Sequence, residues 1–347
     1  MFNYTYISAA FVVSFLTAIL FTPPAARLAR KLGAVDRPGA RRVNVTTVPR
    51  LGGPAMFLAF LLSSLPYLHT VNHGATMLAG GFLFLALGTL DDLFDLRASV
   101  KLAAQILIAL ITYYSGIRVA YITNPLNAGE LIALHPYVSF AITMLWIVGV
   151  TNTLNLIDGL DGLAAGVTCI ASVTLFLVAI EKGQPGSACV AASMAGLSAG
   201  FIRWNFYKAK IFMGDSGAYF LGYMLAVIAI QGAFKSTVGL TYLIPVFVLG
   251  VPIFDTWFAI ARRLKSRRPV MSQPDKGHLH HRMLSAGIGH RETVLLFYAM
   301  TLFLGVFSLL LIRAWLLALY LIGAMAAIVT ILLASGKIFK RKTSEKA

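Results

Sequence analysis

The chain has 347 residues, of which 58% are hydrophobic, and its formal net charge at pH 7 is +16. Ordinary soluble domains are about 45–50% apolar, whereas apolar runs of about 18–20 residues recur here from end to end, so the composition excludes a soluble protein and predicts many membrane helices. The two cysteines, Cys169 and Cys189, lie in apolar segments, which argues against a disulfide framework or a cysteine metal site.

The apolar runs predict an all-α bundle of about eleven transmembrane helices. In chain order we place them near residues 3–22, 50–68, 75–90, 102–122, 137–156, 162–180, 187–204, 216–233, 240–260, 293–312 and 315–334. The first run has no basic start and no small-residue cleavage site, so we expect a retained helix and not a signal peptide. We expect a single integral-membrane domain over residues 1–336.

The basic residues are distributed unevenly between the predicted loops. All but four of the 29 Lys and Arg residues fall in the odd-numbered loops and in a C-terminal tail over residues 337–347; the four exceptions are Arg118, Lys182, Lys235 and Arg313. Basic residues mark the cytoplasmic side, so we place the N-terminus outside and the C-terminus in the cytoplasm. The positive charge is then a topology signal, helped by anionic lipid headgroups, and not a sign of nucleic-acid binding.

The acidic residues also gather on one side. Only Glu130 and Glu181 lie on the predicted exterior, and the other eleven lie at or near the cytoplasmic ends of helices. Burying one Asp at the bilayer centre costs at least about 2.5–3.5 kcal/mol, and clustered carboxylates repel each other unless they face water, a cation or basic groups. We therefore expect a polar cleft that opens to the cytoplasm.

Two motifs at the ends of predicted helices carry most of these side chains. In "GTLDDLFDLRASVKLAAQ", Asp91, Asp92 and Asp95 precede Lys101, which indicates either interfacial carboxylates with a snorkelling lysine or a phosphate and metal site with a base. In "NTLNLIDGLDGLAAG" the polar residues step by three. Their oxygens are the hard ligands that Mg²⁺ prefers, and helix capping would need only one of them. These residues are Asn152, Asn155, Asp158 and Asp161.

Two later segments add anion-binding chemistry. In "RWNFYKAKIFMGDSGAYFLGY", Asp215 opens an apolar helix, either as an N-cap or beside an anion site, and Phe212 is either core filling or a stacking platform for a base. In "RRLKSRRPVMSQPDKGHLHHRML", three histidines lie among basic residues, and they could bind phosphate, bind zinc or be surface residues without a task. We prefer phosphate binding, and no cysteine is in reach for a zinc site. Asp255 could simply pair with Arg262 or Arg263.

Two functions from different classes fit a one-sided polar cleft. A transferase could join a phosphorylated lipid to a soluble nucleotide sugar, because both substrates reach the cytoplasmic face. An ion or solute transporter would place charged groups near the midplane, in broken helices or inverted repeats, and the predicted midplane here is almost free of ionisable groups. The pattern favours the enzyme.

Four motifs in this order, "DDLFD", "NTLNLIDGLDGL", "NFYKAKIFMGDSG" and "HLHH", resemble the polyprenyl-phosphate N-acetylhexosamine-1-phosphate transferases over roughly residues 1–335. That family includes the WecA/TagO branch, the MraY translocases and the eukaryotic dolichyl-phosphate enzyme. The resemblance implies a helical membrane bundle, often dimeric, in the bacterial cytoplasmic membrane, with its active site facing the cytoplasm. It implies transfer of a sugar 1-phosphate from a UDP-sugar to undecaprenyl phosphate with release of UMP, as the first lipid-linked step of a cell-envelope polysaccharide.

The resemblance also implies a role for individual residues and a cofactor, Mg²⁺, which Mn²⁺ could replace. Asn155 and Asp215 match the metal ligands, and Asp91, Asp92, Lys101 and Asp158 make up the catalytic set, with Lys101 on phosphate and Asp91 as the preferred base. The nucleotide-binding positions are Asp161, Asn205 and Phe212. The positions that bind phosphate or sugar are His278, His280, His281 and Arg282.

The branch within the family follows from small differences between motifs. Asp95 and the His-x-His-His pattern resemble the WecA/TagO side, which favours UDP-GlcNAc over UDP-MurNAc-pentapeptide. Asn44 stands where many relatives in this branch carry His, and Thr47 stands where Pro is common. That loop could help select the sugar, so another UDP-N-acetylhexosamine remains an alternative donor.

Overall fold

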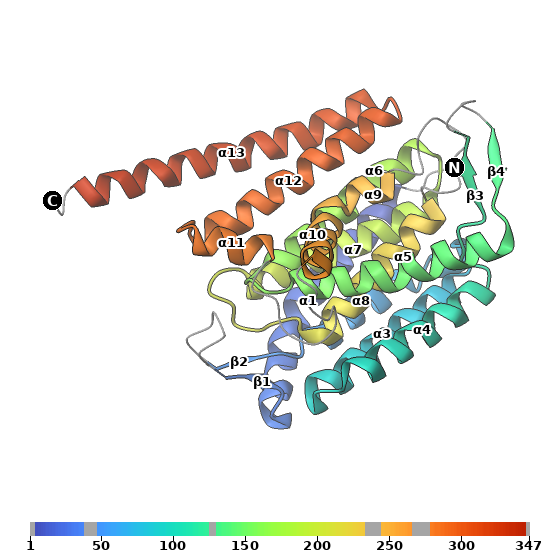
Figure 1. Cartoon of the computed structure of the whole chain (residues 1–347), viewed down its shortest axis with the longest axis horizontal. Helices are drawn as coiled ribbons and strands as arrows, with labels where there is room; N and C mark the ends of the chain where they lie inside the picture. Colours follow the sequence, from blue (N-terminus) through green and yellow to red (C-terminus); the bar gives the residue numbers. More distant parts are fainter. Residues whose placement is uncertain (1–3, 38–46, 125–129, 233–243, 266–277, 345–347) are drawn as a thin grey trace.

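The computed structural model describes residues 4–37, 47–124, 130–232, 244–265 and 278–344, which are almost entirely helical (Figure 1). Each of the eleven predicted segments contains a helix. The helices are α1 (Tyr4–Leu32), α2 (Gly53–Ser64), α3 (Gly74–Phe94), α4 (Ala98–Tyr114), α5 (Pro136–Ile157), α6 (Leu163–Glu181), α7 (Pro185–Asn205), α8 (Gly214–Gly232), α9 (Ile244–Val248), α10 (Gly250–Lys265), α11 (Leu279–Ser285), α12 (His290–Leu311) and α13 (Trp315–Ser344), with a 3₁₀ turn at Leu68–Thr70.

Two short antiparallel hairpins lie at opposite ends of the bundle. One pairs β1 (Val35–Asp36) with β2 (Val48–Pro49), and the other pairs β3 (Tyr121–Thr123) with β4 (Leu131–Ala133). Figure 1 shows the N-terminus beside β3 and β4, whereas β1, β2, α11 and the C-terminus lie toward the other end. The two termini therefore lie at opposite ends of the bundle.

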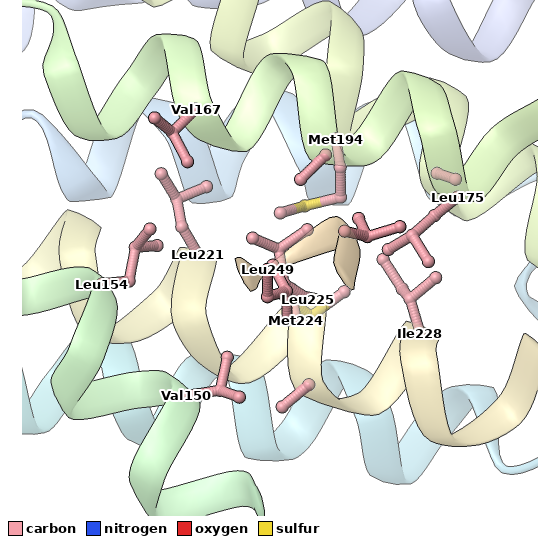
Figure 2. Packing of buried hydrophobic residues seen from close by; sticks show 14 of the residues in the cluster. Val150, Leu154, Val167, Leu175, Met194, Leu221, Met224, Leu225, Ile228 and Leu249 are labelled. Carbon is pink, nitrogen blue, oxygen red and sulfur yellow. The ribbon is translucent and has the colours of Figure 1, made fainter. Parts of the chain in front are cut away.

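Helix α8 forms the centre of the bundle. Every residue from Ser216 to Gly232 is buried, and α8 packs against α2, α3, α5, α6 and α7. In Figure 2, Leu221, Leu225 and Ile228 of α8 face apolar side chains from α5, α6 and α7. Small residues permit this close packing, which in a membrane supplies much of the attraction between helices. At Gly88 of α3, for example, an added β-carbon would collide with the backbone of Asp215.

Seven helices in the described part of the chain are long and apolar enough to cross a membrane. They are α1, α3, α5, α6, α7, α12 and α13, and α2 and α4 are shorter apolar helices. The prediction of about eleven continuous spanning helices is therefore only partly met. The predicted ninth helix is divided, because α9 ends at Val248 and α10 begins at Gly250. Helix α10 is viewed end-on in Figure 1 and crosses the direction of α5.

Two helices extend further than the sequence predicted. Helix α1 continues ten residues past the predicted end and contains Pro23 and Pro24. Pro23 has no N–H to donate to the carbonyl of Ile19, and the indole Nε1 of Trp204 on α7 donates to that oxygen instead, at 3.0 Å. Helix α13 continues to Ser344, so the predicted boundary of a separate tail at residue 337 falls inside a helix.

Candidate active site

A polar cleft of about 320 Å³ lies where the ends of several helices meet. Its walls come from β1, the end of α3, the turn between α5 and α6, the segment before α8, and α11. The side chains and glycines that line it are Asp36, Arg50, Asp92, Asn155, Asp158, Gly159, Leu160, Asp161, Asn205, Phe212, Gly214, Asp215 and His281. The structure thus joins residues from four sequence motifs that are up to 189 positions apart in a single cleft.

Asn155 and Asp215 meet at the floor of the cleft. Asn155 lies in the last turn of α5, Asp215 lies in the first turn of α8, and the Asn155 amide Nδ2 donates to Asp215 Oδ1 at 2.5 Å. This bond leaves the amide oxygen of Asn155 unused, so the pair can present both an amide and a carboxylate oxygen to a ligand.

The carboxylate of Asp92 caps helix α8 from a neighbouring helix. Its Oδ1 accepts the backbone N–H of Asp215 at 3.0 Å, and its Oδ2 accepts that of Ser216 at 3.1 Å. Arg50 supports the same residue, because its Nη2 donates to the Asp92 carbonyl at 2.6 Å. Gly214 has a φ of +72°, and a β-carbon there would collide with Asp92 and with the Arg50 carbonyl. Asp92 thereby fixes the backbone that carries Asp215.

Asp91 lies beside this cap but is not among the residues that line the cleft. Its Oδ2 forms an ion pair with Lys101 Nζ of α4 at 2.5 Å, and its Oδ1 accepts the backbone N–H of Leu96 at 2.9 Å. The carboxylates of Asp91 and Asp92 both act electrostatically on Asp215. The third acidic residue of the motif, Asp95, ends α3 in a left-handed conformation, with a φ of +52°.

The turn between α5 and α6 supplies further carboxylates. Asp158 is half-buried in the cleft wall. Burial raises its pKa to about 8, helped by the nearby carboxylates of Asp215, Asp92 and Asp161. Asp161 Oδ2 accepts the backbone N–H of Ala209 at 3.0 Å. Four carboxyl groups this close together repel each other when they are ionised, and a bound cation would relieve that repulsion.

The segment between α7 and α8 holds Phe212 at the edge of the cleft. Its backbone N–H donates to the Pro49 carbonyl at 2.8 Å, and its carbonyl accepts the N–H of Gly52 at 3.0 Å. Asn205 is buried and supports the same segment: its Nδ2 donates to Ile211 O at 2.9 Å, and its Oδ1 accepts the N–H of Gly162 at 3.0 Å. Asn205 therefore ties the two walls together, although it also lines the cleft.

The three histidines occupy different places. His278 Nδ1 lies 3.0 Å from Asp255 Oδ2 of α10, and the backbone N–H of Leu279 donates to Asp255 Oδ1 at 2.7 Å. His280 is buried, and burial, helped by the adjacent His281, lowers its pKa to about 4, so it is neutral at pH 7. Its ring lies so close to Gly159 that a β-carbon there would be 2.6 Å from Nε2.

Of the three, His281 lines the cleft. The rings of His280 and His281 are 4.3 Å apart, and those of His278 and His280 are 5.9 Å apart and nearly parallel. Asp255, His278 and His280 therefore form a continuous packed path from α10 to the turn that carries Asp158.

An apolar groove of about 650 Å³ lies on the other side of this path, between α10 and α12. Its walls are mainly aliphatic and aromatic, including Phe254, Phe258 and Phe303, and Asp255, Arg262 and Arg282 are its charged residues. Arg282, predicted to bind phosphate or sugar in the polar site, is therefore placed on the groove wall. The groove and the cleft share the histidine segment as a common boundary.

Sequence reasoning did not single out every residue of the cleft. Asp36 lines it from β1, and Arg50 lines it just after β2, where the sequence marks it only as one of the many basic residues of the cytoplasmic loops. A lone Asp at the start of a basic loop gave no signal, because only the pairing of β1 with β2 brings it to the cleft. Asn44, the residue linked to donor choice, lies outside the described residues.

Asp215 and Asn155 at the cleft floor are the residues that would contact a divalent cation. Within the described ranges, no group of three or more His, Cys, Asp or Glu side chains is arranged to hold a metal ion by itself. Mg²⁺ is usually bound through one or two carboxylates together with substrate phosphates and water, and does not need a cage made only of protein. Asp215, with the amide of Asn155 beside it in a cleft rich in carboxylates, fits such an ion held jointly with a diphosphate.

The known proteins to which this chain is similar have closely related names. Residues 75–233 match the family described as glycosyl transferase family 4. The chain is 40% identical to the probable undecaprenyl-phosphate N-acetylglucosaminyl 1-phosphate transferase of Bacillus subtilis, over 84% of this chain and 81% of that protein. It is 35% identical to the decaprenyl-phosphate N-acetylglucosaminephosphotransferase of Mycobacterium tuberculosis, over 84% and 78%. With the undecaprenyl-phosphate alpha-N-acetylglucosaminyl 1-phosphate transferase of Escherichia coli, the identity is 24% over 85% and 81%.

Proposed function

The chain belongs to the polyprenyl-phosphate N-acetylhexosamine-1-phosphate transferases of glycosyl transferase family 4, in their WecA/TagO-like branch, and on that basis we propose its reaction. The protein transfers N-acetylglucosamine 1-phosphate from UDP-GlcNAc to undecaprenyl phosphate and releases UMP. The product is the first lipid-linked intermediate of a cell-envelope polysaccharide.

One observation carries this proposal: a polar cleft and an apolar groove lie on the two sides of the same histidine segment. The cleft suits a water-soluble nucleotide sugar, with Phe212 and Asp161 at the uridine end. The groove, rich in aromatic side chains, suits a polyprenyl chain, and Arg262 and Arg282 place positive charge on its wall. A protein that only transports a solute would not need a lipid-sized apolar groove beside its polar site.

The residues in and beside the cleft have separate roles in the proposed reaction. Asp215 and Asn155 would hold Mg²⁺, which supplies positive charge to the diphosphate. Asp92 keeps the backbone of Asp215 in place through the cap on α8. Lys101 is paired with Asp91 and lies next to this cap. From there it can bind the acceptor phosphate once the nucleotide sugar occupies the cleft. His281, on the cleft wall, is positioned by His280 and can contact the sugar phosphate.

The chemistry is an exchange of one phosphoanhydride for another. An oxygen of the acceptor phosphate attacks the sugar-bearing phosphorus, the bond from that phosphorus to the UMP oxygen breaks, and UMP leaves with the electron pair. The nucleophile is already a phosphate oxygen, so Asp91 has only to orient it or remove a residual proton. We prefer this direct attack to a covalent aspartyl-phosphate intermediate. A phosphorylated Asp formed with UDP-sugar alone would overturn that preference.

The membrane arrangement forms part of the proposal. We propose one integral-membrane domain in which α2, α4 and α8 cross the bacterial cytoplasmic membrane together with the seven longer helices, and in which α9 and α10 together make an eleventh crossing. The N-terminus is then outside, and the cleft, the basic end of the chain and the active site face the cytoplasm. We also propose a homodimer, as in many members of the family.

The direct test uses purified protein, undecaprenyl phosphate, Mg²⁺ and a panel of UDP-sugars: UDP-GlcNAc, other UDP-N-acetylhexosamines and UDP-MurNAc-pentapeptide. We expect UMP release with UDP-GlcNAc. Mn²⁺ should support the reaction in place of Mg²⁺, and a chelator should abolish it. Added UMP should drive the reaction backward, from the lipid-linked sugar to UDP-GlcNAc. Asp215→Asn should lower kcat by about 10²- to 10³-fold, as loss of one electrostatic contact to developing charge typically does, with an unchanged melting temperature.

Two results would contradict the proposal. Preference for another UDP-sugar would correct the donor and leave the reaction class in place. Flux of a solute into liposomes that contain the protein, without any lipid-linked sugar being formed, would instead support the transporter alternative.

A further inference from the structure

A small basic pocket lies between α1 and the end of α7, apart from the cleft and the groove. Its volume is about 150 Å³, and it shares no lining residue with either of them. Three of its lining residues are basic, and the full lining is Thr22, Pro23, Ala26, Arg27 and Arg30 of α1, Trp204 of α7, and Lys210 and Ile211 of the following segment. No role in the transferase reaction accounts for this pocket.

The pocket is built on a fixed aromatic ring. Trp204 is held by the bond from its Nε1 to the Ile19 carbonyl that Pro23 leaves without a helical donor. The Lys210 ammonium lies 5.3 Å from the centre of the Trp204 ring, and the Arg203 guanidinium lies 5.6 Å from it. The backbone N–H of Lys210 also donates to the Trp204 carbonyl at 2.8 Å, which fixes the base of the lysine side chain.

The charges around this ring are all positive. Arg27 and Arg30 are three residues apart and so lie on one face of α1. Within the described part of the chain, no carboxylate lines the pocket, and neither these arginines nor Lys210 forms an ion pair. Like charges held close together repel each other, and an anion bound between them would relieve that repulsion.

The position of the pocket indicates the source of the anion. The first apolar run of α1 ends near Phe21, so Arg27 and Arg30 stand one to three turns beyond it, at the depth where tryptophan and basic residues meet the membrane interface. Just before them, α1 exposes a row of apolar side chains: Leu16, Leu20 and Phe21 are 50%, 66% and 42% exposed. An acyl chain can lie along that row while a headgroup sits in the pocket.

We propose that this pocket binds the phosphodiester headgroup of an anionic phospholipid from the leaflet on the cleft side. Basic pockets between transmembrane helices on the cytoplasmic side are a recurrent form of anionic-lipid site. Arg27, Arg30 and Lys210 contact the phosphate, and the exposed face of α1 holds the chains. Since Lys210 belongs to the segment that carries Phe212, a bound headgroup also braces one wall of the cleft against α1.

Native mass spectrometry of the delipidated protein in neutral detergent tests this proposal. The protein is titrated with phosphatidylglycerol, with phosphatidylcholine of the same chains, or with inorganic phosphate. The test variant Arg30→Gln/Lys210→Gln is compared with Lys31→Gln/Lys208→Gln. The control removes the same charge from neighbouring exposed positions that do not line the pocket.

We expect the first phosphatidylglycerol to bind at least tenfold more weakly to the test variant and within twofold of wild type to the control. Phosphatidylcholine should bind at least tenfold more weakly than phosphatidylglycerol to the wild type. Equal loss of affinity in both variants would show unspecific attraction by net charge and would overturn the site. Displacement of phosphatidylglycerol by an equimolar amount of inorganic phosphate would show a soluble-anion site and overturn the lipid assignment. Neither result depends on transferase activity.

Discussion

The carboxylates in and beside the cleft have different tasks, although the sequence presents them as similar residues. Asp92 caps α8, Asp91 pairs with Lys101, and Asp215 meets Asn155. Asp158 remains in the wall, where burial first, and then three acidic neighbours, raise its pKa. These differences come from hydrogen bonds between helices that are distant in sequence, which motif spacing alone does not contain.

We expect the ionisation of Asp158 to make the stability of the protein depend on pH. Its folded-state pKa of about 8 lies above the ordinary value of about 4, so the folded chain binds this proton more tightly between those two pH values. The stability linked to the proton is fully present below about pH 4 and is lost as the pH rises through about 8.

We therefore expect Asp158→Asn to raise the melting temperature in chelator-containing buffer, with a difference from wild type that grows from pH 6 to pH 9. Thermal unfolding in detergent at four pH values measures this difference. A gap that stays constant with pH would show that Asp158 does not titrate in this range.

Asp92→Asn should destabilise the fold as well as slow the reaction. An amide retains one acceptor oxygen but presents an NH₂ group to the second backbone N–H at the start of α8, so one buried donor loses its partner. We expect a loss of about 1–2 kcal/mol in the free energy of unfolding, as for other caps. Asp95→Asn is the matched control, because Asn tolerates the left-handed conformation, and it should stay within about 0.5 kcal/mol of wild type. Equal melting temperatures for Asp92→Asn and wild type would contradict the capping role.

At the scale of elements, the helices followed from the sequence more readily than their interruptions did. Each of the eleven apolar segments contains a helix, and seven helices in the described part of the chain are long and apolar enough to span a membrane. Apolar length did not locate the break between Val248 and Gly250 or the extension of α1 through Pro23. The extension depends on a hydrogen bond from Trp204, which lies 185 residues away in the sequence.

Helix α10 links the groove to the cleft through Asp255, and a substitution there tests that link. In Asp255→Asn the side-chain oxygen can still accept the N–H of Leu279, but the charge beside His278 is lost. We expect an unchanged melting temperature and a kcat lower by about 10²-fold, the typical effect of a small displacement of a positioning group. The Michaelis constants for UDP-GlcNAc and for undecaprenyl phosphate should be measured separately.

The adjacent variant Thr256→Val serves as the control, because within the described residues its hydroxyl makes no hydrogen bond. If both variants retain wild-type kcat, the path from α10 through His278 to the cleft has no part in catalysis.

At the scale of the whole molecule, the distribution of charge predicted that the polar chemistry gathers at one end, and it does so in the structure. The side of the membrane on which this end lies can be measured by cysteine labelling. In a Cys169→Ala/Cys189→Ala background, Leu131→Cys on β4 should react with an impermeant maleimide in intact cells. Lys208→Cys should react only after permeabilisation. The reverse pattern would invert the proposed topology.

The complete burial of α8 has a consequence for how the enzyme responds to its membrane. Spanning helices that touch lipid tilt when the hydrocarbon layer becomes thicker or thinner than their apolar length. The buried part of α8 touches only protein. A change in bilayer thickness therefore reaches Asp215 indirectly, through neighbouring helices such as α3 and α5. The groove beside α10, in contrast, has aromatic residues with large exposed surfaces. Changes in bilayer thickness should then alter the capture of the lipid acceptor well before they disturb the floor of the nucleotide site.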